Sequence, residues 1–196
     1  IDEGVKYTHP DLVANMWTNP KETENGKDDD GNGYEDDIHG YNFVDNGPIT
    51  WAEGVGKNID SGHGTHCAGT IAAVNNNGVG VSGVAGGTGN SDGVKIMSCQ
   101  IFSRNSGGSS IQTARAYKYA ADNGASVISC SFGYSAGVIK SDGTYKRECL
   151  AEYDALKYFE ASKNNPVLDG GVAIFAAGND ATNYSAYPGA LSDVIS

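Results

Sequence analysis

The stretch SGHGTHCAG, residues 61–69, decides the fold that we predict for this chain. It places His63 between Gly62 and Gly64, and it leads directly into the apolar run TIAAV. A histidine in an ordinary core needs no glycine on either side, whereas a histidine that another backbone must approach closely does. The stretch therefore predicts a helix that starts near His63 and carries an accessible imidazole at its amino end.

Short apolar runs alternate with amphipathic segments after this stretch. Periodicity and capping residues predict helices at 63–74, 109–124 and 149–164, and strands at 94–102, 126–132 and 170–179, with DVIS at 193–196 as the start of another. This alternation is typical of βαβ units with right-handed crossovers, and the uniformly apolar strands indicate that helices cover both faces. We predict an α/β fold of three layers, α/β/α, around a mainly parallel sheet, with ligands at the carboxyl ends of the strands.

Size and charge narrow the classes of protein. The 196 residues suit one compact domain with a sizeable core. The net charge of −11 argues against nucleic acids and anionic membrane surfaces as partners. No apolar stretch approaches the roughly 20 residues that a membrane span needs. The predicted partners are therefore neither nucleic acid nor membrane.

The cysteines do not indicate a metal site. Cys67, Cys99, Cys130 and Cys149 form no C-x-x-C pair, so a structural zinc site is not expected. Three of them stand in apolar segments, where buried free thiols are the simplest interpretation. One disulfide stays open as an alternative.

The order of four short motifs resembles the subtilisin-like serine peptidases, or subtilases. IDEG at 1–4, HGTHCAG at 63–69, SFG at 131–133 and AAGN at 176–179 follow one another along the chain. The family motifs are D-[ST]-G, H-G-T-H-x-A-G and A-A-G-N, followed by G-T-S-M-A, and a cysteine after the second histidine resembles the proteinase K branch. The similarity extends over essentially the whole chain, as one peptidase domain in which residues of about 13–60 are an acidic insertion after the aspartate motif.

The resemblance implies a role for several residues. His63 is expected to be the general base, Asp2 to orient its ring, and Asn179 to donate to the oxyanion. Two segments would clamp an extended peptide substrate through their main chains: Ser106, Gly107 and Gly108 in one, and Ser131, Phe132 and Gly133 in the other. Phe132 as an ordinary core residue stays open, and His66 is interpreted as structural.

Two positions depart from the family pattern. Glu3 stands where the family has Ser or Thr, and this second negative charge is expected to raise the pKa of Asp2 and His63 if it points toward them. The sequence stops at Ser196 without a G-T-S-M-A segment, so we expect a domain truncated at both ends that is inactive alone. A propeptide or the rest of the domain is the expected partner, and the family resemblance implies a secreted or extracellular protein.

The acidic loop DDDGNGYEDD, residues 28–37, predicts structural calcium. Asp28, Asp30, Asn32 and Asp36 take positions 1, 3, 5 and 9 of an EF-hand-like pattern around Gly33, and these four residues are the expected ligands. A second expected site pairs Asp11 with Asn76. A solvated loop without a cation is the alternative. At the level of function, the alternatives are a non-catalytic scaffold of the same fold and a calcium-binding adhesion module.

Overall fold

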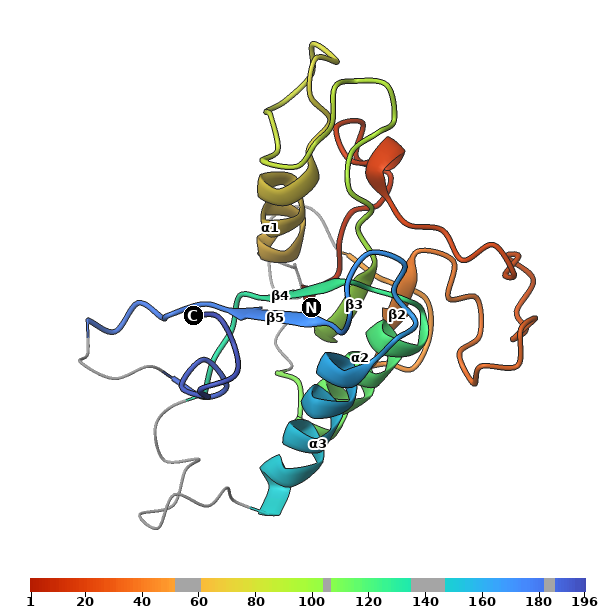
Figure 1. Ribbon diagram of the computed structural model, residues 1–196. Helices are drawn as coiled ribbons and strands as arrows, with labels where there is room; N and C mark the ends of the chain where they lie inside the picture. The colour runs from red at the N-terminus through yellow and green to blue at the C-terminus, as the bar shows by residue number, and fades with distance from the viewer. Residues whose placement is uncertain (52–60, 104–106, 135–146, 182–185) are drawn as a thin grey trace. The chain divides into compact units, whose positions relative to one another are not determined.

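The computed structural model describes residues 1–51, 61–103, 107–134, 147–181 and 186–196 (Figure 1). The chain forms two compact units. One consists of residues 2–107, and the other consists of residue 1 together with residues 108–196. The prediction of a single domain with an acidic insertion stays a prediction.

The unit of residues 2–107 is built on a parallel three-stranded sheet. Its strands are β1 (Asp2–Glu3), β2 (Gly40–Asn42) and β3 (Ser98–Phe102), in the order β1-β3-β2. The central strand β3 is buried almost throughout. The unit also contains the 3-10 helix η1 (Val13–Asn15) and the helix α1 (His63–Ala72), which packs against β1.

Two glycines position α1, and they show which backbone approaches its first residues. Gly62 caps the helix in the left-handed conformation, with φ of 79°. A Cβ on Gly64 would lie 2.4 Å from the backbone oxygen of Glu3. The backbone that approaches so closely is therefore strand β1, and the absence of a side chain at Gly64 lets the start of the helix lie directly on that strand.

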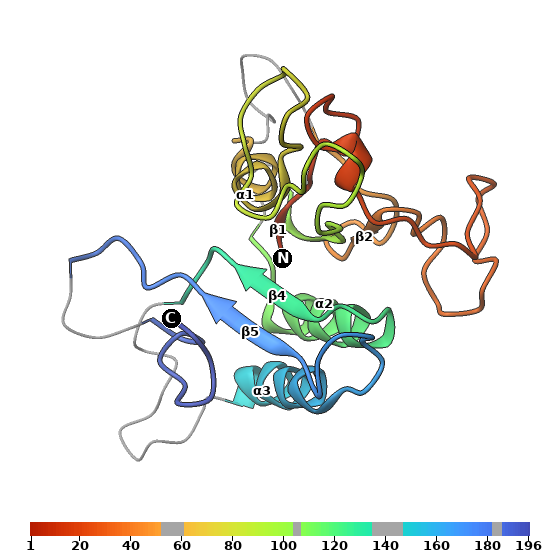
Figure 2. The same ribbon diagram turned by 45° about the horizontal axis from the view of Figure 1, so that its top comes forward.

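The unit that contains residues 108–196 pairs two parallel strands with two helices. Its elements are α2 (Ser110–Asp122), β4 (Val127–Cys130), α3 (Arg147–Ala161) and β5 (Val172–Phe175). Strands β4 and β5 are hydrogen-bonded in parallel, and the two helices pack on each other on one side of them (Figure 2). On the strands, Ile128 and Phe175 are buried while Val127 and Ile174 are exposed.

Helix α2 starts where the sequence predicts. Ser109 and Gln112 form a complete capping box, in which each side chain accepts from the backbone N–H of the other residue. The aromatic side chains of Tyr117 and Phe159, from α2 and α3, are fully buried in this unit. The capping box and the buried aromatic side chains thus both stabilise α2 where the sequence predicts a helix.

The predicted α/β fold is confirmed, with parallel pairing in both sheets. The strands are shorter than the apolar runs, since strand β3 begins only at Ser98. Strand β2 falls within residues 13–60, the region expected to be an acidic insertion, for which no strand was predicted. The segment 193–196 contributes only an isolated bridge between Ile195 and Ile174. None of the helices in the described residues combines the length and hydropathy of a membrane span.

Candidate active site

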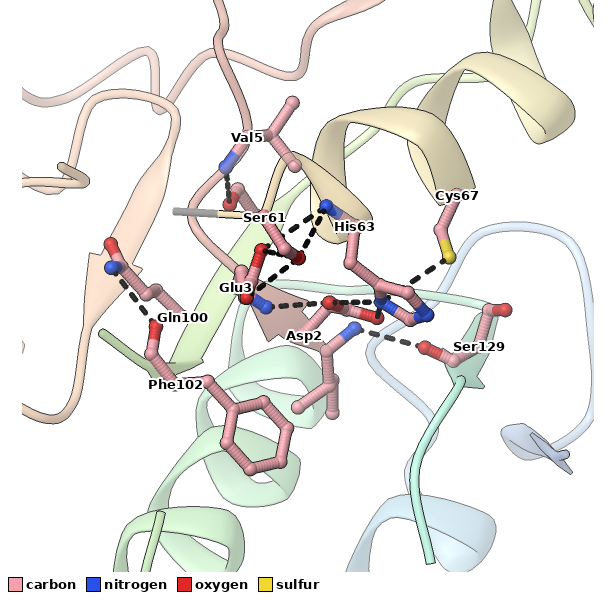
Figure 3. A network of polar contacts seen from close by, with 11 residues as sticks. Asp2, Glu3, Val5, Ser61, His63, Cys67, Gln100, Phe102 and Ser129 are labelled. Atoms are coloured by element: carbon pink, nitrogen blue, oxygen red, sulfur yellow. Dashed lines mark hydrogen bonds and ion pairs between the residues drawn. The ribbon is translucent and has the colours of Figure 1, made fainter. Parts of the chain in front are cut away.

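Asp2 and His63 form a close pair at the start of α1. The Nδ1 atom of His63 lies 2.8 Å from Oδ1 of Asp2 and 3.0 Å from Oδ2 (Figure 3). The aspartate side chain is 10% exposed and the histidine side chain 51% exposed. A buried carboxylate therefore holds one nitrogen of an imidazole that solvent reaches. When the Nδ1 proton is donated to Asp2, Nε2 is the nitrogen that can accept a proton.

The surroundings of the imidazole raise the pKa of His63. The largest cause is the hydrogen bond to Asp2, which favours the protonated ring. Partial burial acts in the opposite direction, and the negative charges of Asp2 and Glu3 add to the increase. Glu3 therefore raises the pKa of His63, as expected from its negative charge.

Glu3 also contacts the backbone at the start of the helix. Its carboxylate accepts from the Ser61 hydroxyl at 3.0 and 2.9 Å, and from the backbone N–H of His63 at 3.1 Å (Figure 3). In the motif comparison, Glu3 is a departure from the family pattern, and no contact with the helix was predicted for it. The structure places its side chain at the amino end of α1.

Cys67 lies against the same imidazole. Its sulfur is 3.8 Å from Nδ1 of His63, one helical turn away. It is only partly buried, whereas Cys99, Cys130 and Cys149 are buried, and none of the four cysteines forms a disulfide. The interpretation of Cys67 as a thiol buried in an apolar run is wrong, because residues four apart on a helix share a face and His63 stands at the exposed end.

Two further site residues that the family resemblance implies, Asn179 and Phe132, belong to the unit that contains residues 108–196. Asn179 follows the carboxyl end of β5 and is exposed. Phe132 follows β4, is half-buried, and its ring centroid lies 6.3 Å from that of Phe175 and 6.2 Å from that of Tyr134. Its contacts with neighbouring aromatic rings therefore leave the core interpretation open.

Five further residues complete the two predicted substrate segments. Ser131 is half-buried and Gly133 is exposed, immediately after β4. Gly107 is exposed and Gly108 half-buried, and they stand where the two compact units meet along the sequence. Ser106 lies outside the described residues. A role in substrate binding stays a prediction for all of them.

The acidic loop brings together a set of carboxylates that differs from the predicted one. Oxygen atoms of Glu22, Asp28 and Asp30 lie within 4.8 Å of one another. Asp36 instead accepts from the backbone N–H groups of Asn25 and Gly26, at 2.9 to 3.1 Å. The alternate spacing within 28–37 could not reveal Glu22, which precedes the loop.

Glu22 is the most buried acid of this cluster. It is 7% exposed, and its Oε1 accepts from the backbone N–H groups of Asp29 and Asp30. Its Oε2 is buried and has no hydrogen-bond partner among the described residues. Burial is the largest cause that raises the pKa of this carboxyl, and the charges of Asp37 and Asp29 also raise it.

The predicted Asp11 site also involves a different asparagine. Asp11 is buried and accepts from the Asn77 side chain at 2.7 Å and from the backbone N–H of Val81 at 2.9 Å. Asn76 donates to the carbonyl of Thr88 instead. Successive residues in a loop point in different directions, so a one-residue error in alignment changes the predicted neighbour.

A buried carboxylate that orients an accessible imidazole, on an α/β scaffold, is the pairing found in hydrolases that activate a nucleophile. The chain belongs to the subtilase family of serine peptidases, whose family model matches residues 1–196.

Individual relatives support this assignment. The thermophilic serine proteinase of Bacillus sp. (strain AK1) is 32% identical over 197 residues, which cover 100% of this chain and 36% of that protein. Subtilisin-like protease 1 of Plasmodium vivax is 36% identical over 137 residues, 68% of this chain and 20% of that protein. The crystal structure of the nisin leader peptidase NisP from Lactococcus lactis matches with a TM-score of 0.59 and 27% identity, over 99% of this chain and 52% of that one. The chain thus spans about half of the length of these relatives, or less.

Proposed function

We propose that this chain supplies the base and its orienting acid to a serine endopeptidase. The supporting observation is the 2.8 Å contact between Nδ1 of His63 and the Asp2 carboxylate. In the proposed reaction, Nε2 of His63 takes the proton of a serine hydroxyl as that oxygen attacks the peptide carbonyl. Asp2 stabilises the imidazolium that forms, and the imidazolium then protonates the leaving amine.

Asn179 is proposed to stabilise the negative oxygen of the tetrahedral intermediate. Its side-chain amide carries two N–H donors, and an exposed position after a strand suits contact with substrate. The segments around Gly107 and Phe132 are proposed to pair with the main chain of an extended peptide. Peptides or proteins are the substrates of the family, and pairing through the backbone tolerates many sequences.

The serine nucleophile is proposed to come from a G-T-S-M-A segment that the 196 residues do not contain. We therefore expect the isolated 196 residues to be inactive and the full-length protein to cleave peptides. The test is hydrolysis of a fluorogenic peptide by both, with His63→Gln in the full-length protein as the control. Turnover by the 196 residues alone would contradict this assignment of the nucleophile, and an inactive full-length protein would favour the scaffold alternative.

We also propose that the acidic loop binds a structural calcium ion. Hard cations prefer carboxylate oxygens, and the buried Oε2 of Glu22 is an acceptor that a cation would satisfy. Glu22, Asp28 and Asp30 would hold the ion, with Asn32 beside them, whereas the contacts of Asp36 favour a structural role for it. A second ion at Asp11 would involve Asn77. A secreted location and a propeptide partner are proposed from the family alone.

A further inference from the structure

The Glu3 side chain lies at the amino end of α1, where no side chain of the N-cap residue accepts a hydrogen bond. The residue at the N-cap of α1 is Gly62, which has no side chain to accept from the first N–H groups. The Glu3 carboxylate reaches this end from β1 and accepts from the backbone N–H of His63 at 3.1 Å. The Ser61 hydroxyl, which donates to the same carboxylate, also lies 3.2 Å from that N–H.

The charge of Glu3 acts on the imidazole as well as on the helix. A carboxylate at the amino end of a helix interacts favourably with the partial positive charge there. In the described part of the unit of residues 2–107, the titratable groups that face the His63 ring are Asp2 and Glu3 from β1, and Cys67 from α1. Both acids are on the same strand, so the position of that strand fixes both charges relative to the ring.

We propose that Glu3 is a positioning residue, whose carboxylate fastens the first turn of α1 to β1 and adds a negative charge beside the Asp2–His63 pair. A serine or threonine at this position would add no charge. The role in catalysis depends on the proposed peptidase function, but the role at the helix start does not.

Four variants of the full-length protein separate the charge from the hydrogen bonds. Glu3→Gln keeps an oxygen acceptor and removes the charge, whereas Glu3→Ala removes both. Ser61→Ala keeps the charge and removes the bridging hydroxyl. Asp154→Asn removes one negative charge from an exposed position on α3 and is the matched control. The readouts are the NMR titration of the His63 imidazole, assigned with His63→Gln, and the melting temperature.

We expect the titration midpoint of His63 to fall in Glu3→Gln and Glu3→Ala, because Glu3 raises its pKa. It should stay unchanged in Asp154→Asn and nearly unchanged in Ser61→Ala. The melting temperature should fall by about 2–4 °C in Glu3→Ala, as for a lost helix cap, and by less in Glu3→Gln. A wild-type midpoint in Glu3→Gln, or an equal shift in Asp154→Asn, would overturn the proposal.

Peptide hydrolysis by the same variants distinguishes this proposal from the proposed function. If the full-length enzyme is active, the acidic limb of its kcat/KM profile should move to lower pH in Glu3→Gln. An inactive full-length protein in which the midpoint of His63 still falls would reject the peptidase function and retain the positioning role. An active enzyme whose midpoint does not move would reject the positioning role alone.

Discussion

Asp2 is the residue on which the proposed chemistry depends most directly. We predict that Asp2→Asn in the full-length enzyme lowers kcat by about 10⁴-fold, the size of loss found when a triad aspartate becomes asparagine. The amide cannot stabilise the imidazolium, and it can donate to Nδ1 and so favour the wrong tautomer. The same change should lower the pKa of His63, because the bond to Asp2 is the main cause of its increase. An active enzyme with unaltered kcat would show that another group orients the ring.

Asn179 provides an independent test of the oxyanion assignment. Asn179→Ala should lower kcat by about 10²- to 10³-fold, the effect of removing such a donor from subtilisin, and leave KM almost unchanged. The effect is confined to kcat because the donor acts on a charge that develops only in the transition state. Asp180→Ala is the control, since Asp180 is the exposed neighbour in the same turn. Equal losses in both variants would indicate a change in the loop rather than a lost donor.

Glu152 is a buried acid outside the proposed chemistry. It is fully buried on α3, where it accepts from the Tyr117 hydroxyl at 3.3 Å, and burial raises its pKa to about 8. In the unfolded chain this carboxyl has its ordinary pKa of about 4.5 and ionises above it, so the free energy of unfolding should decrease as the pH rises from about 4.5 to 8.

Glu152→Gln removes this pH dependence. We predict that the variant is more stable than the parent protein by up to a few kcal/mol at pH 8, and equally stable at pH 4, in chemical denaturation. Asp154→Asn, on the exposed side of the same helix, should show neither effect. A parent protein whose stability does not change between these pH values would contradict the neutral, buried state of Glu152.

Helix α1 carries two glycines that differ sharply in their surroundings. A Cβ on Gly64 would collide with the Glu3 backbone, whereas a Cβ on Gly69 would meet nothing within 4 Å. Alanine favours a helix over glycine by about 1 kcal/mol. We therefore predict that Gly69→Ala raises the free energy of unfolding by up to that amount.

Gly64→Ala should lower the same free energy despite its better helix propensity, because α1 must move away from β1. That movement would also separate His63 from Asp2, so the pKa of His63 should fall in Gly64→Ala and stay constant in Gly69→Ala. Thermal denaturation and imidazole NMR measure the two effects. Stabilisation by both substitutions would contradict the close approach of the strand.

The elements differ in how far the sequence could predict them. Local signals define α1 and α2, whose first turns carry glycines or a capping box, and both helices start where expected. Strand β2 has three residues and is recognised only through its pairing with β3, which is distant in sequence. Glu22 was missed for the same reason, because its neighbours Asp28 and Asp30 come close only in the folded loop. The Asp2–His63 contact was predictable through the motif order and not through periodicity.

At the scale of the whole molecule, the net charge of −11 destabilises the folded state through repulsion among the acidic groups, and a bound cation would reduce that repulsion. Several acids of the loop lie close together, and the buried oxygen of Glu22 is unsatisfied among the described residues. We predict that calcium at about 100 times its dissociation constant stabilises the full-length protein by about 2.7 kcal/mol over the chelated form. The melting temperature should then rise by roughly 5–10 °C.

The variant Glu22→Gln isolates the loop from other calcium sites. It removes a buried charge that the cation would neutralise, so we expect most of the calcium-dependent rise in melting temperature to disappear. Glu24→Gln, an exposed acid two residues away, should keep the full rise. In the absence of calcium, Glu22→Gln should melt at or above the temperature of the parent protein, because a buried carboxylate without a cation is unfavourable. Melting that is insensitive to chelator in the parent protein would contradict both the calcium site and the adhesion alternative.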